Sequence, residues 1–164
     1  MSNSSKEKQN QEAKRKYRQN AALILERKDK KILICERADY EDAWQFPQGG
    51  VDKGEDPIDA LYREVEEEIG LSPEFYKVID YREGYRYKFD NRHPKMKRYL
   101  GQEQTYFRCR FNGENKDINL NVSKPEFVSF CWIKPEKFNL KWVPDFKRKV
   151  YTEVFRDFYD LDIT

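Results

Sequence analysis

The chain has no long apolar run, few cysteines and a single histidine. No apolar stretch approaches the roughly 20 residues that span a bilayer, and the N-terminus has no apolar segment typical of a signal peptide. We therefore expect a cytoplasmic protein without membrane contact. The three cysteines, Cys35, Cys109 and Cys131, lack metal-site spacing, and a reducing compartment fits them. His93 stands in a polar segment, and we expect it to be solvated rather than a ligand.

Hydrophobic residues of all kinds make up only 38% of the 164 residues, matched by charged residues at 38%. Aromatic residues reach 15%, and their large side chains can build the core that a low aliphatic content would not. This length favours one domain, which we place at residues 17–164. Residues 1–16 are polar and charged, which predicts a disordered tail.

The formal net charge is only +2, but the charges are unevenly distributed. Between Asp52 and Asp80 there are ten acidic and three basic residues, a net charge of −7. Between Arg82 and Arg110 there are nine basic and three acidic residues, a net charge of +6. Adjacent acidic and basic segments suit a site where metal cations and phosphates meet, while two solvated faces are the alternative.

Local patterns predict a mixed sheet with helices. Apolar or alternating runs indicate strands within residues 21–26, 31–35, 44–47, 76–89, 104–111 and 126–133, with a turn at Gly49-Gly50. A helix is predicted to begin at Asp56-Pro57, where Asp can cap and Pro is tolerated, and to end at Gly70. A last helix is predicted from residue 144 or 145 to about residue 159. The order of these elements indicates a sheet between helices.

The segment from Gly49 to Leu71 carries the strongest chemical signal. Glu64, Glu67 and Glu68 are spaced i, i+3 and i+4, so they lie one turn apart on the predicted helix. Without a cation these carboxylates repel one another. A hard divalent cation reverses that interaction, because it prefers oxygen ligands and keeps water and phosphate oxygens in its shell. Such a site can activate water and neutralise a phosphoryl group in transfer. A solvated acidic helix face is the alternative for the glutamates alone.

The whole segment resembles the signature of the Nudix hydrolase superfamily. The matching identities are Gly49, Glu55, Arg63, Glu64, Glu67, Glu68 and Gly70, with aliphatic residues at Val65 and Leu71. The run WQFPQGG at residues 44–50, with residues 17–20, 86–88, 101–102, 125–127 and 146–148, resembles the RNA pyrophosphohydrolase branch, which includes dinucleoside polyphosphate hydrolases. That branch usually has proline where Gln19 stands. The resemblance implies a Nudix-type α/β/α sandwich with a mixed central β-sheet.

The resemblance also implies roles for single residues. The implied metal ligands are Glu64, Glu67, Glu68, Glu126 and the backbone carbonyl of Gly49, with magnesium as the cation and manganese as the alternative. One of the three helix glutamates would also be the base for the attacking water. Arg63 would orient the carboxylates, including Glu55, and so support catalysis. For Glu126 the alternative is a surface glutamate at the edge of a strand.

The implied substrate contacts are Arg18, Arg37, Gln48, Phe146 and Lys147. Guanidinium groups suit phosphates and also stack on bases, and Phe146 with Lys147 resembles an aromatic-plus-basic pair that holds a nucleotide base. The alternatives are surface arginines and a Phe146 that begins the apolar face of the last helix.

Together these features predict metal-dependent hydrolysis of a diphosphate linkage, with conversion of 5′-triphosphate RNA to 5′-monophosphate RNA as the first hypothesis. A dinucleoside polyphosphate substrate is the second hypothesis. A non-catalytic RNA- or nucleotide-binding module is the competitor from another class, although a binder has no need of mutually repelling glutamates. Protein partners are not identified by the sequence.

Overall fold

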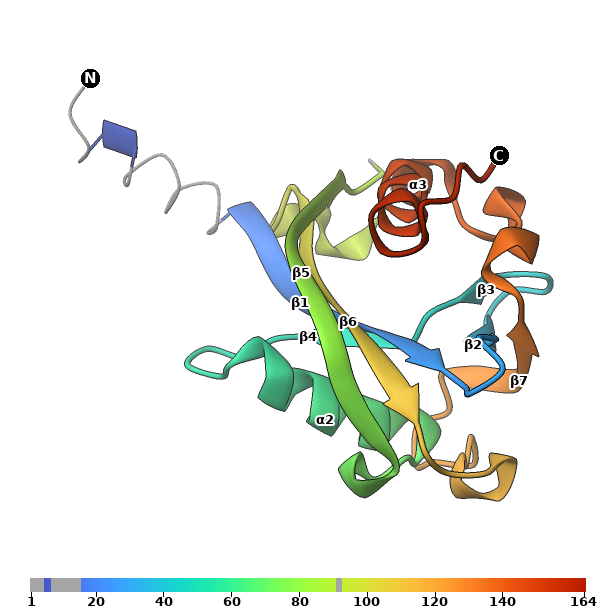
Figure 1. Ribbon diagram of the computed structural model, residues 1–164. Helices are drawn as coiled ribbons and strands as arrows, with labels where there is room; N and C mark the ends of the chain where they lie inside the picture. The colour runs from blue at the N-terminus through green and yellow to red at the C-terminus, as the bar shows by residue number, and fades with distance from the viewer. Residues whose placement is uncertain (1–4, 7–15, 91–92) are drawn as a thin grey trace.

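The described part of the chain, residues 5–6, 16–90 and 93–164 of a computed structural model, folds into a seven-stranded sheet with a helix on each face (Figure 1). The strands are β1 (Tyr17–Glu26), β2 (Ile32–Arg37), β3 (Trp44–Gln45), β4 (Gln48–Gly50), β5 (Tyr76–Lys88), β6 (Gly101–Phe111) and β7 (Phe127–Ile133). Their order is β3-β2-β1-β6-β5, with β4 paired to β1 and β7 to β2. β1 and β6 are parallel and the other pairs are antiparallel, so the predicted mixed sheet is confirmed.

β1 organises the core because its side chains alternate between the two faces of the sheet. Ala21, Leu23 and Leu25 pack with helix α2 (Pro57–Ile69), whereas Ala22 and Ile24 pack with helix α3 (Asp145–Tyr159). A strand that is covered on both faces has a nearly continuous apolar sequence, and β1 has such a sequence. The predicted α/β/α sandwich is therefore confirmed, and Figure 1 shows the two helices on opposite sides of the sheet.

Aromatic side chains fill the face of the sheet that α3 covers. The Phe46 ring is fully buried and stacks on Tyr151 and Phe138, with ring centroids 5.5 and 6.0 Å apart. Phe155 adds a third ring at 5.9 Å. These rings supply the buried area that a chain poor in aliphatic residues lacks, which confirms the predicted aromatic core.

Two local predictions need correction. Gly49 and Gly50 form strand β4 rather than a turn, because they pair with Ala21 and Asn20 of β1. The central strand satisfies their backbone hydrogen bonds, and this pairing outweighs the preference of glycine for turns. Asp56 does stand at the cap position of α2, but its side chain makes no capping hydrogen bond.

The expected tail, residues 1–16, lies outside the described residues except for residues 5–6 and 16. In the described part of the chain, no helix is long and apolar enough to cross a membrane.

We predict that Gly70→Ala destabilises the protein by more than about 1 kcal/mol. Gly70 ends α2 with φ 62°, and a Cβ there would lie 2.8 Å from the carbonyl oxygen of Asn119. Left-handed backbone alone costs an L-residue about 1–2 kcal/mol. Gly54→Ala is the matched control, because Gly54 has φ 81° but open space around its Cβ position. Urea unfolding of both variants measures the difference, and equal losses would exclude the clash with Asn119.

Candidate active site

Helix α2 presents three glutamates beside its buried apolar stripe. Leu61, Val65 and Ile69 pack into the core, and this packing fixes the rotation of the helix. Glu68 is then buried, with 9% of its surface exposed, while Glu64 is half-buried and Glu67 is exposed at the surface. The carboxylates therefore occupy the edge of the helix between core and solvent. Glu66 is exposed, as the helical spacing predicts.

Arg63 joins the loop before α2 to the glutamates. Its Nε and Nη2 donate to the two carboxylate oxygens of Glu55 at 3.0 and 2.8 Å. Nη1 donates to Glu64 at 2.7 Å, and Nη2 also donates to the carbonyl oxygen of Gly50 at 2.9 Å. Hydrogen bonding to Arg63 lowers the pKa of Glu55 to about 2. This placement is the one expected of a residue that orients the carboxylates.

The two glycines of β4 allow charged side chains to lie directly against the backbone. A Cβ on Gly49 would overlap the carboxylate of Glu64, and one on Gly50 would overlap the guanidinium of Arg18. No residue with a side chain fits either position without displacing these groups. β4 therefore brings a carboxylate and an arginine to the same narrow part of the surface.

Glu68 lies among other acids rather than opposite a base. Burial raises its pKa to about 9, and the charges of Glu64, Glu126 and Glu67 add to that rise. The backbone N–H of Gln48 donates to Glu68 at 3.3 Å, which opposes the shift. Glu126, just before β7, thus comes close enough to α2 to act on the same carboxyl group. Glu68 is therefore within electrostatic range of the other three predicted acidic ligands.

The chemistry of this group fits a hard divalent cation, because a buried carboxyl whose neighbours are carboxylates gains most from a cation with oxygen ligands. Among the described residues, no three His, Cys, Asp or Glu side chains are yet close enough together to hold a metal ion. Arg63 holds one oxygen of Glu64 by a hydrogen bond.

A second cluster combines aromatic rings and cations at the start of α3. The Phe146 and Tyr87 rings are 5.6 Å apart, and the Lys147 ammonium lies 5.8 Å from the Tyr87 centroid. Burial lowers the pKa of Lys147 to about 8, with a contribution from Arg37. Arg37 itself makes two hydrogen bonds to Asp39, at 2.8 and 2.6 Å. Three predicted substrate contacts, Arg37, Phe146 and Lys147, thus lie together, whereas Arg18 lies with the carboxylates.

The prediction of a solvated His93 is wrong. Its ring stacks on Phe89 with the centroids 4.1 Å apart and meets the Phe146 ring edge-on at 6.2 Å. Burial lowers the pKa of His93, and the charges of Lys95 and Lys147 lower it further. Phe89 lies four residues earlier in the same connection, but Phe146 comes from α3, and this second contact could not be read from the polar composition of the loop.

Gln48, a predicted substrate contact, belongs to a chain of amide side chains whose other members, Asn20, Gln102 and Gln104, had no predicted role. Asn20 donates to Gln48 and to Gln102, the latter at 3.1 Å, and Gln104 donates to Asn20 at 3.0 Å. Arg18 reaches the same Gln102 oxygen at 3.5 Å. Buried polar groups need such partners, and the network holds Gln48 and Arg18 in place. Polar residues inside otherwise buried strands were the signal available.

Part of the basic segment faces away from the site. Arg108 makes a two-pronged ion pair with buried Glu26, at 2.8 and 3.1 Å, at the opposite end of β1 from Arg18. Arg86 pairs with Glu103, and Arg82 pairs with Asp80 at 3.7 Å. The net charge of this segment therefore overstates the positive charge available to a bound substrate.

Residues 16–154 match the NUDIX domain. The chain belongs to the Nudix family. It is 42% identical over 149 residues to an RNA pyrophosphohydrolase of Helicobacter pylori (strain G27), covering 88% of this chain and 94% of the relative. It is also 37% identical over 150 residues to the chloroplastic Nudix hydrolase 26 of Arabidopsis thaliana, covering 87% and 69%. The prediction of a Nudix pyrophosphohydrolase is confirmed, and Nudix hydrolases generally use divalent metal ions.

Solved Nudix structures share the fold at low sequence identity. A Caenorhabditis elegans Ap4A hydrolase binary complex matches with a TM-score of 0.59 and 19% identity, covering 87% of this chain and 99% of the other. The Escherichia coli dihydroneopterin triphosphate pyrophosphohydrolase matches with a TM-score of 0.58 and 17% identity, covering 84% and 95%. These likenesses confirm the Nudix fold.

We predict that the metal-free protein loses stability as pH rises from about 5 to about 9. The pKa of Glu68 lies near 9 in the folded protein, above its ordinary value of 4.5, so the folded state keeps a proton that the unfolded chain releases. The stabilisation that comes from this retained proton is fully present below about pH 4.5, and it disappears as the pH approaches 9. Chemical denaturation in chelator should show the decline, and Glu68→Gln should flatten it. An equal decline in the variant would contradict the assignment.

Proposed function

We propose that this Nudix protein is a magnesium-dependent RNA pyrophosphohydrolase that converts 5′-triphosphate RNA to 5′-monophosphate RNA. The observation that carries the proposal is that Gln102 links two clusters, because it accepts from Arg18, which lies with the carboxylates, and donates to the Tyr87 hydroxyl, which lies with Phe146 and Lys147. The first suits the phosphates and the second suits the 5′ nucleotide. The similarity to the Helicobacter pylori RNA pyrophosphohydrolase, which extends over 88% of the chain, supports the same substrate.

The carboxylates of Glu64, Glu67, Glu68 and Glu126, with the carbonyl of Gly49, are the proposed magnesium ligands. When bound, magnesium supplies positive charge to the phosphate oxygens and lowers the pKa of a water molecule. Arg63 acts as the positioning residue, because it holds Glu55 and Glu64 at fixed places. One of the three helix glutamates accepts the proton of the attacking water.

The remaining contacts hold the substrate. Arg18 neutralises the 5′ phosphates beside the carboxylates, since guanidinium binds phosphate oxygens in pairs. Phe146 and Lys147 hold the first base, and Arg37 beside them meets the base or a 5′ phosphate. Gln48 presents its backbone N–H to Glu68 and its side chain to Asn20, so it joins the metal site to the amide network.

A dinucleoside polyphosphate is the second candidate substrate, and one observation favours it. Arg82, Arg86 and Arg108 are already paired with acids of the protein, so fewer cations are available for the body of an RNA. The chemistry at the carboxylates would be the same for both substrates. Any difference must therefore appear in contacts beyond the reacting phosphates.

We predict that Glu67→Gln or Glu68→Gln abolishes most hydrolysis while the protein stays folded. Each change removes a proposed metal ligand. Glu67→Gln also removes a repelling charge, and Glu68→Gln removes a buried carboxyl that must stay protonated in the folded state, so the metal-free protein should become slightly more stable. Glu66→Gln is the matched control, because Glu66 is exposed on another arc of the same helix. Turnover of triphosphate RNA and thermal unfolding are measured for all three. Wild-type turnover in both ligand variants would exclude these glutamates from the metal site.

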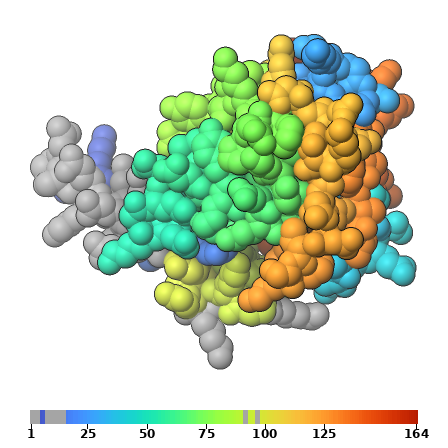
Figure 2. Space-filling model, turned by 90° about the horizontal axis from the view of Figure 1, so that it is seen from below, coloured from blue at the N-terminus to red at the C-terminus, as the bar shows by residue number. Residues whose placement is uncertain are grey.

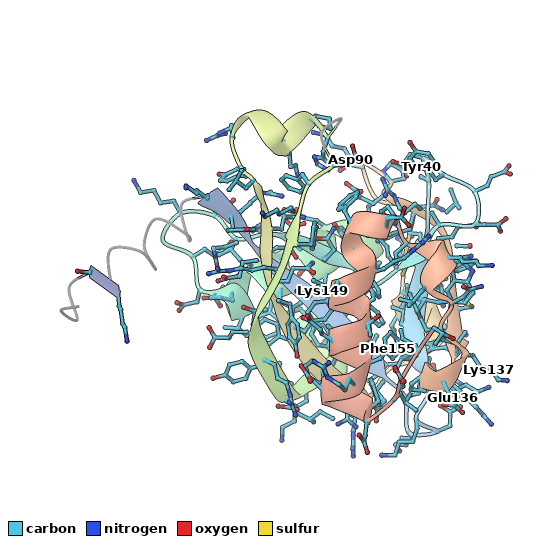
Figure 3. The ribbon with its side chains drawn as sticks, turned by 90° about the horizontal axis from the view of Figure 1, so that it is seen from above. Tyr40, Asp90, Glu136, Lys137, Lys149 and Phe155 are labelled. Atoms are coloured by element: carbon cyan, nitrogen blue, oxygen red, sulfur yellow. The ribbon has the colours of Figure 1, made fainter. Side chains whose placement is uncertain are left out.

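We predict that Phe146→Ala and Lys147→Ala raise KM for triphosphate RNA about tenfold or more and change kcat less. Base stacking is worth roughly 1–3 kcal/mol, and neither residue touches the reacting phosphorus. Lys149→Ala is the control for charge on α3, because Lys149 lies further along the helix with its side chain 83% exposed (Figure 3). An unchanged KM in both variants would leave Phe146 and Lys147 with packing roles only.

We predict that KM for a triphosphate RNA of several nucleotides rises more steeply with salt than KM for diadenosine tetraphosphate. Each backbone phosphate contact to a single strand adds roughly 0.7 to the slope of log K against log salt, and a dinucleotide offers few phosphates beyond the reacting ones. Steady-state kinetics over a series of salt concentrations checks this. Equal slopes would favour the dinucleoside polyphosphate.

A further inference from the structure

The loop between β2 and β3 folds back on Arg37, the last residue of β2. The backbone N–H of Arg37 donates to the carbonyl oxygen of Ala43 at 2.8 Å, and the N–H of Ala38 donates to that of Glu126 at 2.8 Å. The loop is therefore closed at its base and joined to the residue before β7, which is a proposed metal ligand. Figure 2 shows the cyan loop protruding at the edge of the molecule, beside the orange segment that leads into β7.

Two side chains of this loop fix the guanidinium of Arg37. Its Nε and Nη2 donate to the two carboxylate oxygens of Asp39, at 2.8 and 2.6 Å. The same guanidinium lies over the ring of Tyr40, 5.4 Å from the ring centroid. A planar guanidinium held in this way forms a flat surface next to an aromatic ring, and both groups can stack on a further ring.

A cavity of about 470 Å³ lies against the loop and is lined by residues 36–42 and by Val128 of β7. Tyr40 is 65% exposed and Val128 is 61% exposed, whereas Tyr106 and Tyr151 are buried in the core. Cavities of roughly 300–1,000 Å³ are the usual size of small-molecule sites. An aromatic ring and an aliphatic side chain are therefore available to a ligand in this cavity.

The cavity lies at the end of the molecule that carries the active site. Arg37 pairs with Phe127 in the antiparallel register of β2 and β7, so it lies next to Glu126 on the neighbouring strand. In Figure 3 the labelled Tyr40 lies at the same end of the molecule as the beginning of α3, where Phe146 and Lys147 are. A substrate bound at both clusters of the active site would therefore pass beside this loop.

The charges along the cavity favour an uncharged group over a phosphate. Among the described residues that line it, Arg37 is the single base, and four are acids: Glu36, Asp39, Glu41 and Asp42. Since Asp39 already neutralises Arg37, a phosphate would have to displace that carboxylate and would meet the repulsion of the other acids. A nucleobase carries no charge, and its π-face stacks on a tyrosine or a guanidinium whatever its sequence.

We propose that Tyr40, Arg37 and Val128 form a second base-binding position of the active site. It takes the base of the nucleotide that follows the one held by Phe146 and Lys147. The inference rests on the proposed function and extends the contact with the substrate by one nucleotide. Arg37 then meets a base rather than a 5′ phosphate, because its carboxylate partner occupies two of the N–H donors that a phosphate would need.

The first test compares Tyr40→Ala with Tyr81→Ala, which removes the same side chain from another part of the surface. Tyr81 is 58% exposed and stacks on Phe107, with the ring centroids 5.9 Å apart. With magnesium and a triphosphate RNA of several nucleotides, Tyr40→Ala should raise KM about tenfold, as expected for the loss of one stacked base. Tyr40→Phe keeps the ring and should keep most of the affinity, and Tyr81→Ala should leave KM unchanged. An unchanged KM in Tyr40→Ala, or an equal rise in both alanine variants, would overturn the proposal.

An RNA that lacks one base identifies the group bound at Tyr40. The probe is the same triphosphate RNA with an abasic second nucleotide, which keeps the ribose and all the phosphates. For wild type the missing base should raise KM about tenfold, whereas Tyr40→Ala should barely distinguish the two RNAs, because protein and substrate then lack the same contact. An equal effect of Tyr40→Ala on both RNAs would mean that Tyr40 acts on the backbone of the RNA or only on the fold, and would overturn the base assignment.

The role assigned to Arg37 is tested by Asp39→Asn, which weakens the ion pair and preserves the shape of the side chain. If Arg37 is a stacking surface held by Asp39, the variant should have a higher KM for the intact RNA and an unchanged KM for the abasic one. If Arg37 instead binds phosphate, its release from Asp39 should lower KM for both RNAs, and that result would contradict the proposal.

A binding measurement separates this inference from the proposed function. The probe is 5′-monophosphate RNA of the same sequence, measured by calorimetry in magnesium with wild type and Tyr40→Ala. If wild type does not hydrolyse triphosphate RNA but Tyr40→Ala weakens binding of this probe about tenfold, the proposed function fails and the base position stands. If wild type hydrolyses the triphosphate RNA and Tyr40→Ala changes neither binding nor KM, the function stands and the inference is wrong.

Discussion

The mutual repulsion of four carboxylates is the constraint on which the rest of the site depends. Burial, together with the charges of Glu64, Glu126 and Glu67, raises the pKa of Glu68 to about 9. Burying such a group costs free energy unless a cation or hydrogen bonds compensate. The packing of α2 against β1 holds the glutamates together despite that cost, and Arg63 provides part of the compensation.

The parallel pairing of β1 and β6 explains why the cations and amides meet the carboxylates. It sets Arg18 beside Gln102 and Asn20 beside Gln104, and the amide chain links these strands to Gln48 of β4. The opposite end of the same pair carries Glu26 and Arg108, which neutralise each other. The register of β1 and β6 thus places the charged site at one end of this strand pair and the Glu26–Arg108 ion pair, which stabilises the fold, at the other end.

Features that depend on residues close together in the chain were predictable from the sequence, whereas contacts between residues far apart in the chain were not. The spacing of Glu64, Glu67 and Glu68 and the glycine that ends α2 are read within a few residues, so the helix and its acidic face follow directly. The strand formed by Gly49 depends on pairing with Ala21, and the hydrogen bond between Asn20 and Gln104 spans 84 residues of chain. His93 looked solvated for the same reason, since Phe146 lies on another element. Contacts of this kind follow from topology rather than from local pattern.

The proposed function is tested most directly by kcat/KM of the purified protein, with magnesium, for triphosphate RNA and for diadenosine tetraphosphate. The two substrates share the chemistry at the carboxylates and differ in what lies beyond the reacting phosphates. If the protein is an RNA pyrophosphohydrolase, kcat/KM is higher for the RNA, with 5′-monophosphate RNA as the product. A lower kcat/KM for the RNA than for the dinucleotide would contradict it.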